Sequence, residues 1–192
     1  MSDPLSQIIG LLRPRTVFSK GIVGAGAWAV RYAPFGYPSF CVILEGGCRL
    51  DVDGHPSLTL QAGDFLLLPA TPGFSMSGLD PESSLRLASA IPRKPEVPSP
   101  GSGHPSSGGE IRHGRLDGPP DVRLLGGYFL LASPDAPLLV SLLPDVVHVR
   151  GEARLDTLVR LVGDEADECR TGRDLILGRL VEVLLVEALR RA

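Results

Sequence analysis

Residues 62–78 read AGDFLLLPATPGFSMSG, and this stretch has the form of a short buried strand that ends in a turn. Gly63 opens it, four apolar residues follow Asp64, and Pro69 closes the apolar run. Phe74, which carries no metal-binding atom, comes just after the turn. A short apolar run between turn residues is typical of a strand packed on both faces, so the stretch predicts a β fold.

The residues on either side of this stretch repeat the strand pattern. From Val17 to about Arg93, short alternating runs are separated by glycine, proline and aspartate, with turns at Asp53-Gly54 and Ala62-Gly63. The clearest runs are AWAVRYA, FCVILEG, CRLDVDG, SLTLQAG, DFLLLPA and SLRLASAI. VRLLGGYFLLA resumes the pattern at residue 122, and VVHV is expected as a last extended piece. Short strands at this spacing predict an antiparallel sandwich or barrel.

Two further segments complete the first predicted domain, residues 1–150. Leu5, Ile8, Ile9 and Leu12 recur at helical spacing, so a short N-terminal helical arm is expected, ended by Pro14. Residues 92–110 are rich in proline, serine and glycine and hold almost no apolar side chains. Such a segment cannot bury enough surface to offset its chain entropy, so we expect a mobile loop that interrupts the barrel.

The second predicted domain, residues 151–192, is a helical hairpin. Its first helix has one apolar face, and Gly172 is a suitable stop. Its second helix, residues 173–191, is apolar on more than one face and must be covered on two sides. The neighbouring helix can cover one side, and the other is covered by a second subunit or by the rest of the same chain. We favour a homodimer. The residues predicted to form its contact are Leu177, Leu180, Val181, Leu184 and Leu185.

Composition limits the classes of function. Apolar residues make up 43% of the chain and the net charge is −3, which gives these residues no basic face for nucleic acid. The three cysteines form no CxxC pair, which argues against a disulfide framework or structural zinc site and suits a reducing cytoplasm. The longest apolar runs are too short for a bilayer, so a cytoplasmic protein without a membrane partner is expected. The glycines of GIVGAGAW precede a strand rather than a helix, so a dinucleotide loop is not expected.

The strand series with Gly63 and Pro69 resembles the cupin superfamily of small double-stranded β-barrels, or jelly rolls. The resemblance implies that fold, here followed by the helical hairpin. Cupin enzymes bind a metal through three histidines and a glutamate. Aligning the motifs places Cys41, Ile43, Gly47 and Phe74 at those positions. Since zinc and iron sites need about three protein ligands, we expect no metal, no other cofactor and no catalytic residue.

The same substitutions suggest what the barrel could hold instead. Apolar side chains at the former ligand positions make the barrel mouth suitable for a small organic effector. The residues predicted to line the pocket are Trp28, Tyr32, Cys41, Ile43 and Phe74. The alternative is that these side chains simply close the core, because small barrels are often filled by their own side chains. Cys41 is expected to be an inert buried thiol, and the four histidines are expected to have structural or solvated roles.

Several blocks taken in order resemble one group more closely. These are DPLSQIIGLLRPR, FCVILEGGCRLDVDG, LQAGDFLLLPATPGF, LLVSLLPDVVHV and GRLVEVLLVEALRR. They are similar to the cupin-type N-terminal domain of AraC-family transcription regulators. The resemblance implies a non-enzymatic domain that senses an effector and dimerises, with DNA bound by a helix-turn-helix half absent from this chain. The alternatives are a free-standing cupin, either a metal-dependent enzyme or a non-catalytic binding module.

Overall fold

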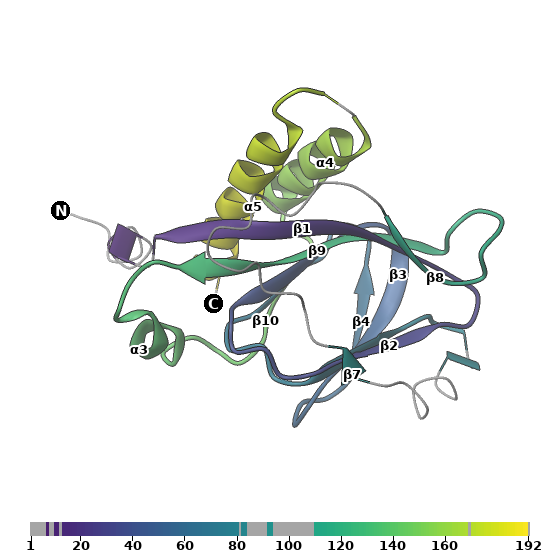
Figure 1. Ribbon diagram of the computed structural model, residues 1–192, viewed down its shortest axis with the longest axis horizontal. Coiled ribbons are helices and arrows are strands. Elements are labelled where there is room, and N and C mark those ends of the chain that lie inside the picture. The colour runs from purple at the N-terminus through teal and green to yellow at the C-terminus, as the bar shows by residue number, and fades with distance from the viewer. Residues whose placement is uncertain are drawn as a thin grey trace.

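The computed structural model describes residues 7, 10–11, 13–80, 82–83, 92–93, 110–168 and 170–191. Figure 1 shows a β-barrel with two helices packed together on one side of it. The strands are β1 Pro14–Ala25, β2 Ala29–Tyr32, β3 Ser39–Val52, β4 Leu58–Gln61, β5 Phe65–Leu68, β6 Phe74–Ser77, β7 Pro92–Arg93, β8 Ile111–Gly114, β9 Val122–Leu131 and β10 Val147–Val149. The helices are α3 Ala136–Val140, α4 Ala153–Asp167 and α5 Arg173–Leu189.

The long strand β3 joins the two halves of the barrel. Its first part pairs with β5 and β9, and its second part pairs with β4 and β6. The strands follow the order β7-β2-β6-β3-β9-β1-β8, and β10 pairs with β5. At Gly46, where β3 passes from one half to the other, the backbone has φ +68 and a Cβ would collide with the carbonyl of Asp121. Glycine is required there, because other residues rarely adopt this conformation.

The buried residues form two clusters on opposite faces of the same strands. Phe40 and Val42 of β3 point to an outer cluster shared with the helices, whereas Cys41 and Ile43 point to an inner cluster inside the barrel. Strand β5 alternates in the same way, with Phe65 and Leu67 outside and Leu66 and Leu68 inside. Successive side chains of a strand face opposite sides. The sequence FLLL is therefore apolar throughout because both faces of this part of the sheet are covered.

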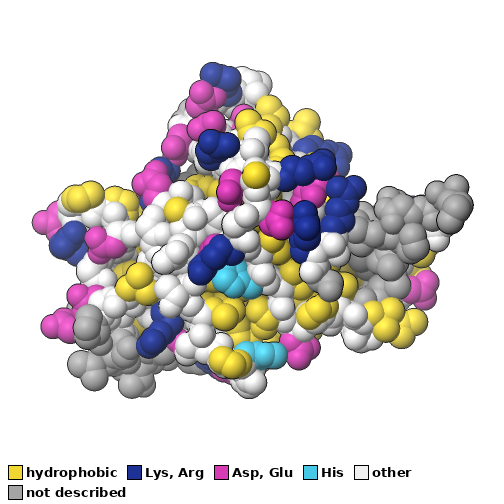
Figure 2. All heavy atoms as spheres, turned by 180° about the vertical axis from the view of Figure 1, so that it is seen from behind, with side chains coloured by type: hydrophobic (Ala, Val, Ile, Leu, Met, Phe, Trp, Pro, Cys, Tyr) yellow, Lys and Arg dark blue, Asp and Glu magenta, His cyan; other side chains and the backbone are white. Residues whose placement is uncertain are grey.

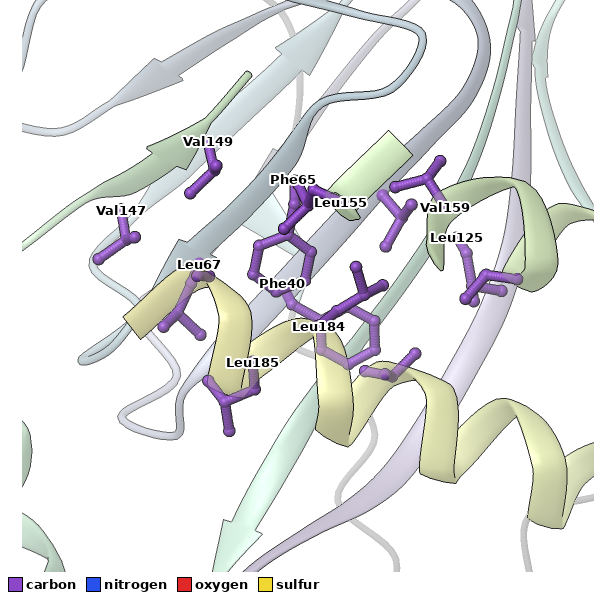
Figure 3. Packing of buried hydrophobic residues seen from close by; sticks show 14 of the residues in the cluster. Phe40, Phe65, Leu67, Leu125, Val147, Val149, Leu155, Val159, Leu184 and Leu185 are labelled. Atoms are coloured by element: carbon purple, nitrogen blue, oxygen red, sulfur yellow. The ribbon is translucent and has the colours of Figure 1, made fainter. Parts of the chain in front are cut away.

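The outer cluster attaches the helices to the barrel. Helix α5 packs against β1, β5 and β10, and α4 packs against β3. Figure 3 shows Leu184 and Leu185 of α5 facing Phe40, Phe65 and Leu67 of the sheet. A hydrogen bond from Thr16 Oγ1 to the carbonyl of Gly178, 3.1 Å long, also joins β1 to α5. The hairpin and this side of the barrel thus share a single core.

The predicted fold class is confirmed. The strand, barrel and hairpin assignments hold within the described residues, and VVHV supplies β10. Most of the predicted N-terminal helix, the SLRLASAI strand and most of the loop at 92–110 lie outside those residues, as does Cys169. The division of the chain at residue 150 stays a prediction. None of the described helices is both long and apolar enough to cross a membrane.

Candidate functional site

The five residues predicted to line an effector pocket come together at the inner cluster. Trp28, Cys41 and Ile43 are buried there, and the half-buried Tyr32 and Phe74 pack against it. Tyr32 and Phe74 face each other in the register of β2 and β6, and their rings stack with centroids 4.8 Å apart. That these side chains line an open pocket stays a prediction, as does the alternative that they close the core.

The positions that would bind a metal in an enzymatic barrel do not fit one here. Cys41 is the one position of the four with a side-chain donor, since Ile43, Gly47 and Phe74 carry none. Burial raises the pKa of Cys41 well above its usual value, and it raises the pKa of Cys48 to about 12. Both thiols are therefore protonated at neutral pH, whereas metals bind and oxidants attack the thiolate. Within the described ranges no group of three or more histidine, cysteine, aspartate or glutamate side chains could hold a metal ion.

Trp28 explains one glycine, Gly24, of the stretch GIVGAGAW. Its buried ring stacks on His113, with centroids 5.8 Å apart, and packs directly against Gly24. A Cβ at position 24 would overlap the indole ring. This glycine therefore makes room for Trp28 and belongs to strand β1 rather than to a loop that binds phosphate.

A buried carboxylate that the sequence did not reveal joins β5 to β10. Asp64, which is 1% exposed, lies in the turn before β5 and accepts hydrogen bonds from Arg150 Nη2 at 2.6 Å and Nε at 2.8 Å. It also accepts the backbone N–H of Gln61 at 2.9 Å, and His148 Nε2 lies 3.0 Å from Oδ2. His148 is thus held beside Asp64, and the structural or solvated role expected of it stays a prediction.

The negative charge of Asp64 is stabilised by its hydrogen-bond partners. Desolvation alone would raise its pKa, but the hydrogen bonds from Arg150, Gln61 and His148 outweigh it, and the pKa of Asp64 is lowered. The carboxylate is therefore ionised at neutral pH. Spacing gave no signal for this cluster, because Asp64 and Arg150 are 86 residues apart in the sequence.

A cleft lies on the outside of the barrel beside this cluster. Its volume is about 310 Å³, and it runs along β10 to the end of α5. The lining residues are Pro144, Val146, Val147, His148, Val149, Arg150, Glu152 and Arg191. None of the five residues predicted to line an effector pocket takes part in it.

The predicted dimer residues are placed differently from the expectation. Leu177, Val181, Leu184 and Leu185 are buried within the chain's own outer cluster, and Leu180 is half-buried beside it. The first four are therefore covered by the barrel and by α4, and they are not at the surface where a second chain could contact them. These four of the five predicted residues are thus covered by the same chain, and a dimer contact through Leu180 stays a prediction.

Other apolar side chains of the hairpin remain at the surface. The exposed ones are Leu161, Leu175, Ile176 and Val183. Ile176, Leu180 and Val183 recur at helical spacing and so lie on one face of α5. Figure 2 shows hydrophobic side chains at the surface of the helical part of the molecule, among charged ones. We call the row Ile176, Leu180 and Val183 the α5 stripe.

Comparison with known proteins places these features in context. The profile of a family described as Cupin matches residues 3–192. Two proteins named as AraC-like transcription regulators, from Streptomyces lividans and Streptomyces antibioticus, are 30% and 29% identical to the chain. Each alignment covers 98% of this chain and 59% of the relative, so the chain spans about three fifths of the length of these curated relatives. The structure of ToxT from Vibrio cholerae with bound unsaturated fatty acid covers 93% of this chain and 53% of that one, with 9% identity and a TM-score of 0.44, too low to support any assignment.

Proposed function

The chain belongs to the cupin family, and on this premise we propose that it is the effector-sensing and dimerising domain of an AraC-type transcription regulator, without catalytic activity. The observation that carries the proposal is the inside of the barrel. Cys41, Ile43 and Phe74 occupy positions that bind metal in enzymatic cupins, and all three contribute to one apolar cluster. Such a surface suits a small organic molecule and offers no reactive centre.

The relatives support the regulatory part of the proposal. Both are named as AraC-like regulators, and their similarity to this chain extends over almost all of it. DNA would be bound by a helix-turn-helix half outside these 192 residues, which agrees with the net charge of −3. We propose a cytoplasmic location for the same reason, since such a regulator must reach DNA.

The strands shared by the two clusters give a route from effector to helices. In β3, Cys41 and Ile43 face the barrel interior, while Phe40 and Val42 contact the hairpin's core. Arg123 of β9 adds a polar link, with Nη1 2.8 Å from Glu45 of β3 and Nη2 paired with Asp167 at the end of α4. An effector that binds one arrangement of these strands more tightly would favour one placement of the hairpin.

A thermal-shift screen tests the sensing role. We expect some small apolar or aromatic compound to raise the unfolding midpoint of the chain.

Replacing Phe74 by alanine should then weaken binding of that compound about tenfold, because an aromatic partner is lost at the barrel mouth. Calorimetric titration measures the change. Phe35→Ala is the matched control, since Phe35 is a half-buried ring that belongs to neither cluster. Equal losses in the two variants, or no binding compound at all, would count against the proposal.

Dimerisation through the α5 stripe is tested by Val183→Glu. Val183 is 45% exposed, so a charge there should leave folding nearly unchanged but should be costly in an apolar interface. Sedimentation velocity is expected to show dimers of the natural chain and monomers of the variant. Leu116→Glu, at an exposed leucine between β8 and β9, should remain dimeric. A dimer that persists in Val183→Glu would refute this contact.

A further inference from the structure

We propose that the cleft along β10 is a binding site for a small organic anion, either a carboxylate or a phosphate ester. The cleft lies outside the barrel, and the assignment does not depend on the regulatory function proposed above. Its volume of about 310 Å³ is at the lower end of the range for small-molecule sites. Seven of its eight lining residues come from the segment 144–152 around β10, and the eighth, Arg191, follows the end of α5.

The charged side chains around the cleft differ in how far they are exposed to solvent. The side chains of Arg150 and Arg191 are 47% and 55% exposed, whereas that of Asp64, the partner of Arg150, is 2% exposed. Glu152, the other acid at the cleft, is paired with Arg191 at 3.0 Å. The side chain of Glu152 is 38% exposed, so the two guanidinium groups are the most exposed charges at the cleft. That arrangement favours an anion.

Both arginines keep hydrogen-bond donors to spare. Arg150 uses Nε and Nη2 on Asp64, and Nη2 also donates to the carbonyl of Thr59 at 2.7 Å. Arg191 uses Nη2 on Glu152. Within the described part of the chain, Nη1 of each has no hydrogen-bond partner, and a guanidinium carries five N–H donors. Carboxylate and phosphate oxygens match such donors in geometry and charge.

The remaining lining residues set the size and polarity of the ligand. Val147 and Val149 are buried in the outer cluster, and the half-buried Val146 packs against the inner one. Because Val147 and Val149 are packed into the outer cluster, Val146 and Pro144 supply the apolar side chains beside the two arginines, and most of the lining is polar. The lining therefore suits an anionic group on a small, largely polar body. Bound there, it would contact the barrel through Arg150 and the end of the hairpin through Arg191.

Titration of the 192-residue chain with succinate and with glycerol phosphate, followed by calorimetry, tests the assignment. At least one should bind, with succinate alone indicating a carboxylate site and glycerol phosphate alone a phosphate site. The uncharged analogue succinamide should not bind. Arg191→Ala should weaken binding about tenfold, the loss of one charge-assisted hydrogen bond. Arg179→Ala is the matched control, because Arg179 lies on α5, the helix that precedes Arg191, is 71% exposed and pairs with Glu182 away from the cleft.

A second variant gives a change of opposite sign. Glu152→Gln removes the acid that competes for Arg191 and should tighten binding several-fold. The proposal is overturned if neither anion binds, if succinamide binds as well as succinate, if Arg179→Ala weakens binding as much as Arg191→Ala, or if Glu152→Gln does not tighten it. These outcomes do not test the binding of an effector inside the barrel, because all of the variants leave Phe74 and the inner cluster unchanged.

Discussion

Replacing Leu184 by alanine is expected to lower the free energy of unfolding by about 2–5 kcal/mol. Leu184 is fully buried between the barrel and the hairpin, so the substitution leaves a cavity in the core that these two parts share. Urea denaturation followed by circular dichroism measures the change. An exposed leucine of the neighbouring helix α4 provides the control, since Leu161→Ala at a 47% exposed position outside the α5 stripe should cost less than about 0.5 kcal/mol.

This comparison separates the two explanations for the apolar character of α5. If Leu184 made a dimer contact instead, its replacement would change the oligomeric state and leave the stability of the monomer nearly intact. The structure predicts the reverse for Leu184, which should control stability, and the proposed α5 stripe assigns association to Val183. Similar losses of stability in both variants would contradict the packing of α5 described above.

Replacing Asp64 by asparagine is expected to cost about 2–3 kcal/mol of stability. The amide can no longer neutralise Arg150, and it meets His148 and the N–H of Gln61 with weaker acceptors. The cost stays in this range because the side chain of Arg150 is half-exposed and can regain water. Asp53→Asn is the control, since its pair with Arg31 is exposed and should contribute less than about 1 kcal/mol. Equal costs in the two variants would show that the Asp64 cluster does not hold β5 and β10 together.

The same carboxylate gives a pH dependence of known sign. The pKa of Asp64 is lower in the folded chain than in the unfolded one, so its contribution is fully present above the unfolded value of about 4. It is lost as the pH falls through the lower, folded pKa. Below pH 4 the natural chain should therefore lose more stability than Asp64→Asn does. Parallel acid profiles for the two proteins would rule out this contribution.

Local patterns predicted the barrel well because they report directly on which faces are buried. The alternation in FCVILEG and the glycine turns predicted β3 and its neighbours, and the block resemblance supplied their arrangement. The same patterns could not say what covers each face. The second helix is apolar on several sides, and nothing in its sequence distinguishes a partner subunit from the barrel of the same chain. The structure buries Leu184 against the barrel, so the dimer prediction moves to the α5 stripe.

One of the two candidate sites could be predicted from the sequence, and the other could not. Trp28, Tyr32, Cys41, Ile43 and Phe74 could be grouped from the sequence, because aligned motifs and strand alternation place them on one side of the barrel wall. The cluster of Asp64, His148 and Arg150 could not, because its members meet through the pairing of β5 with β10, far apart along the chain. The cleft beside that cluster could not be predicted from the sequence for the same reason.

This cupin barrel is proposed to bind an organic molecule without reacting with it. The most direct test is to titrate the chain with a compound that raises its unfolding midpoint, before and after treatment with a metal chelator, and to recover the compound afterwards. We predict the same dissociation constant in both titrations and complete recovery of unchanged compound. Binding that disappears on chelation, or conversion of the compound that depends on added metal, would contradict the claim.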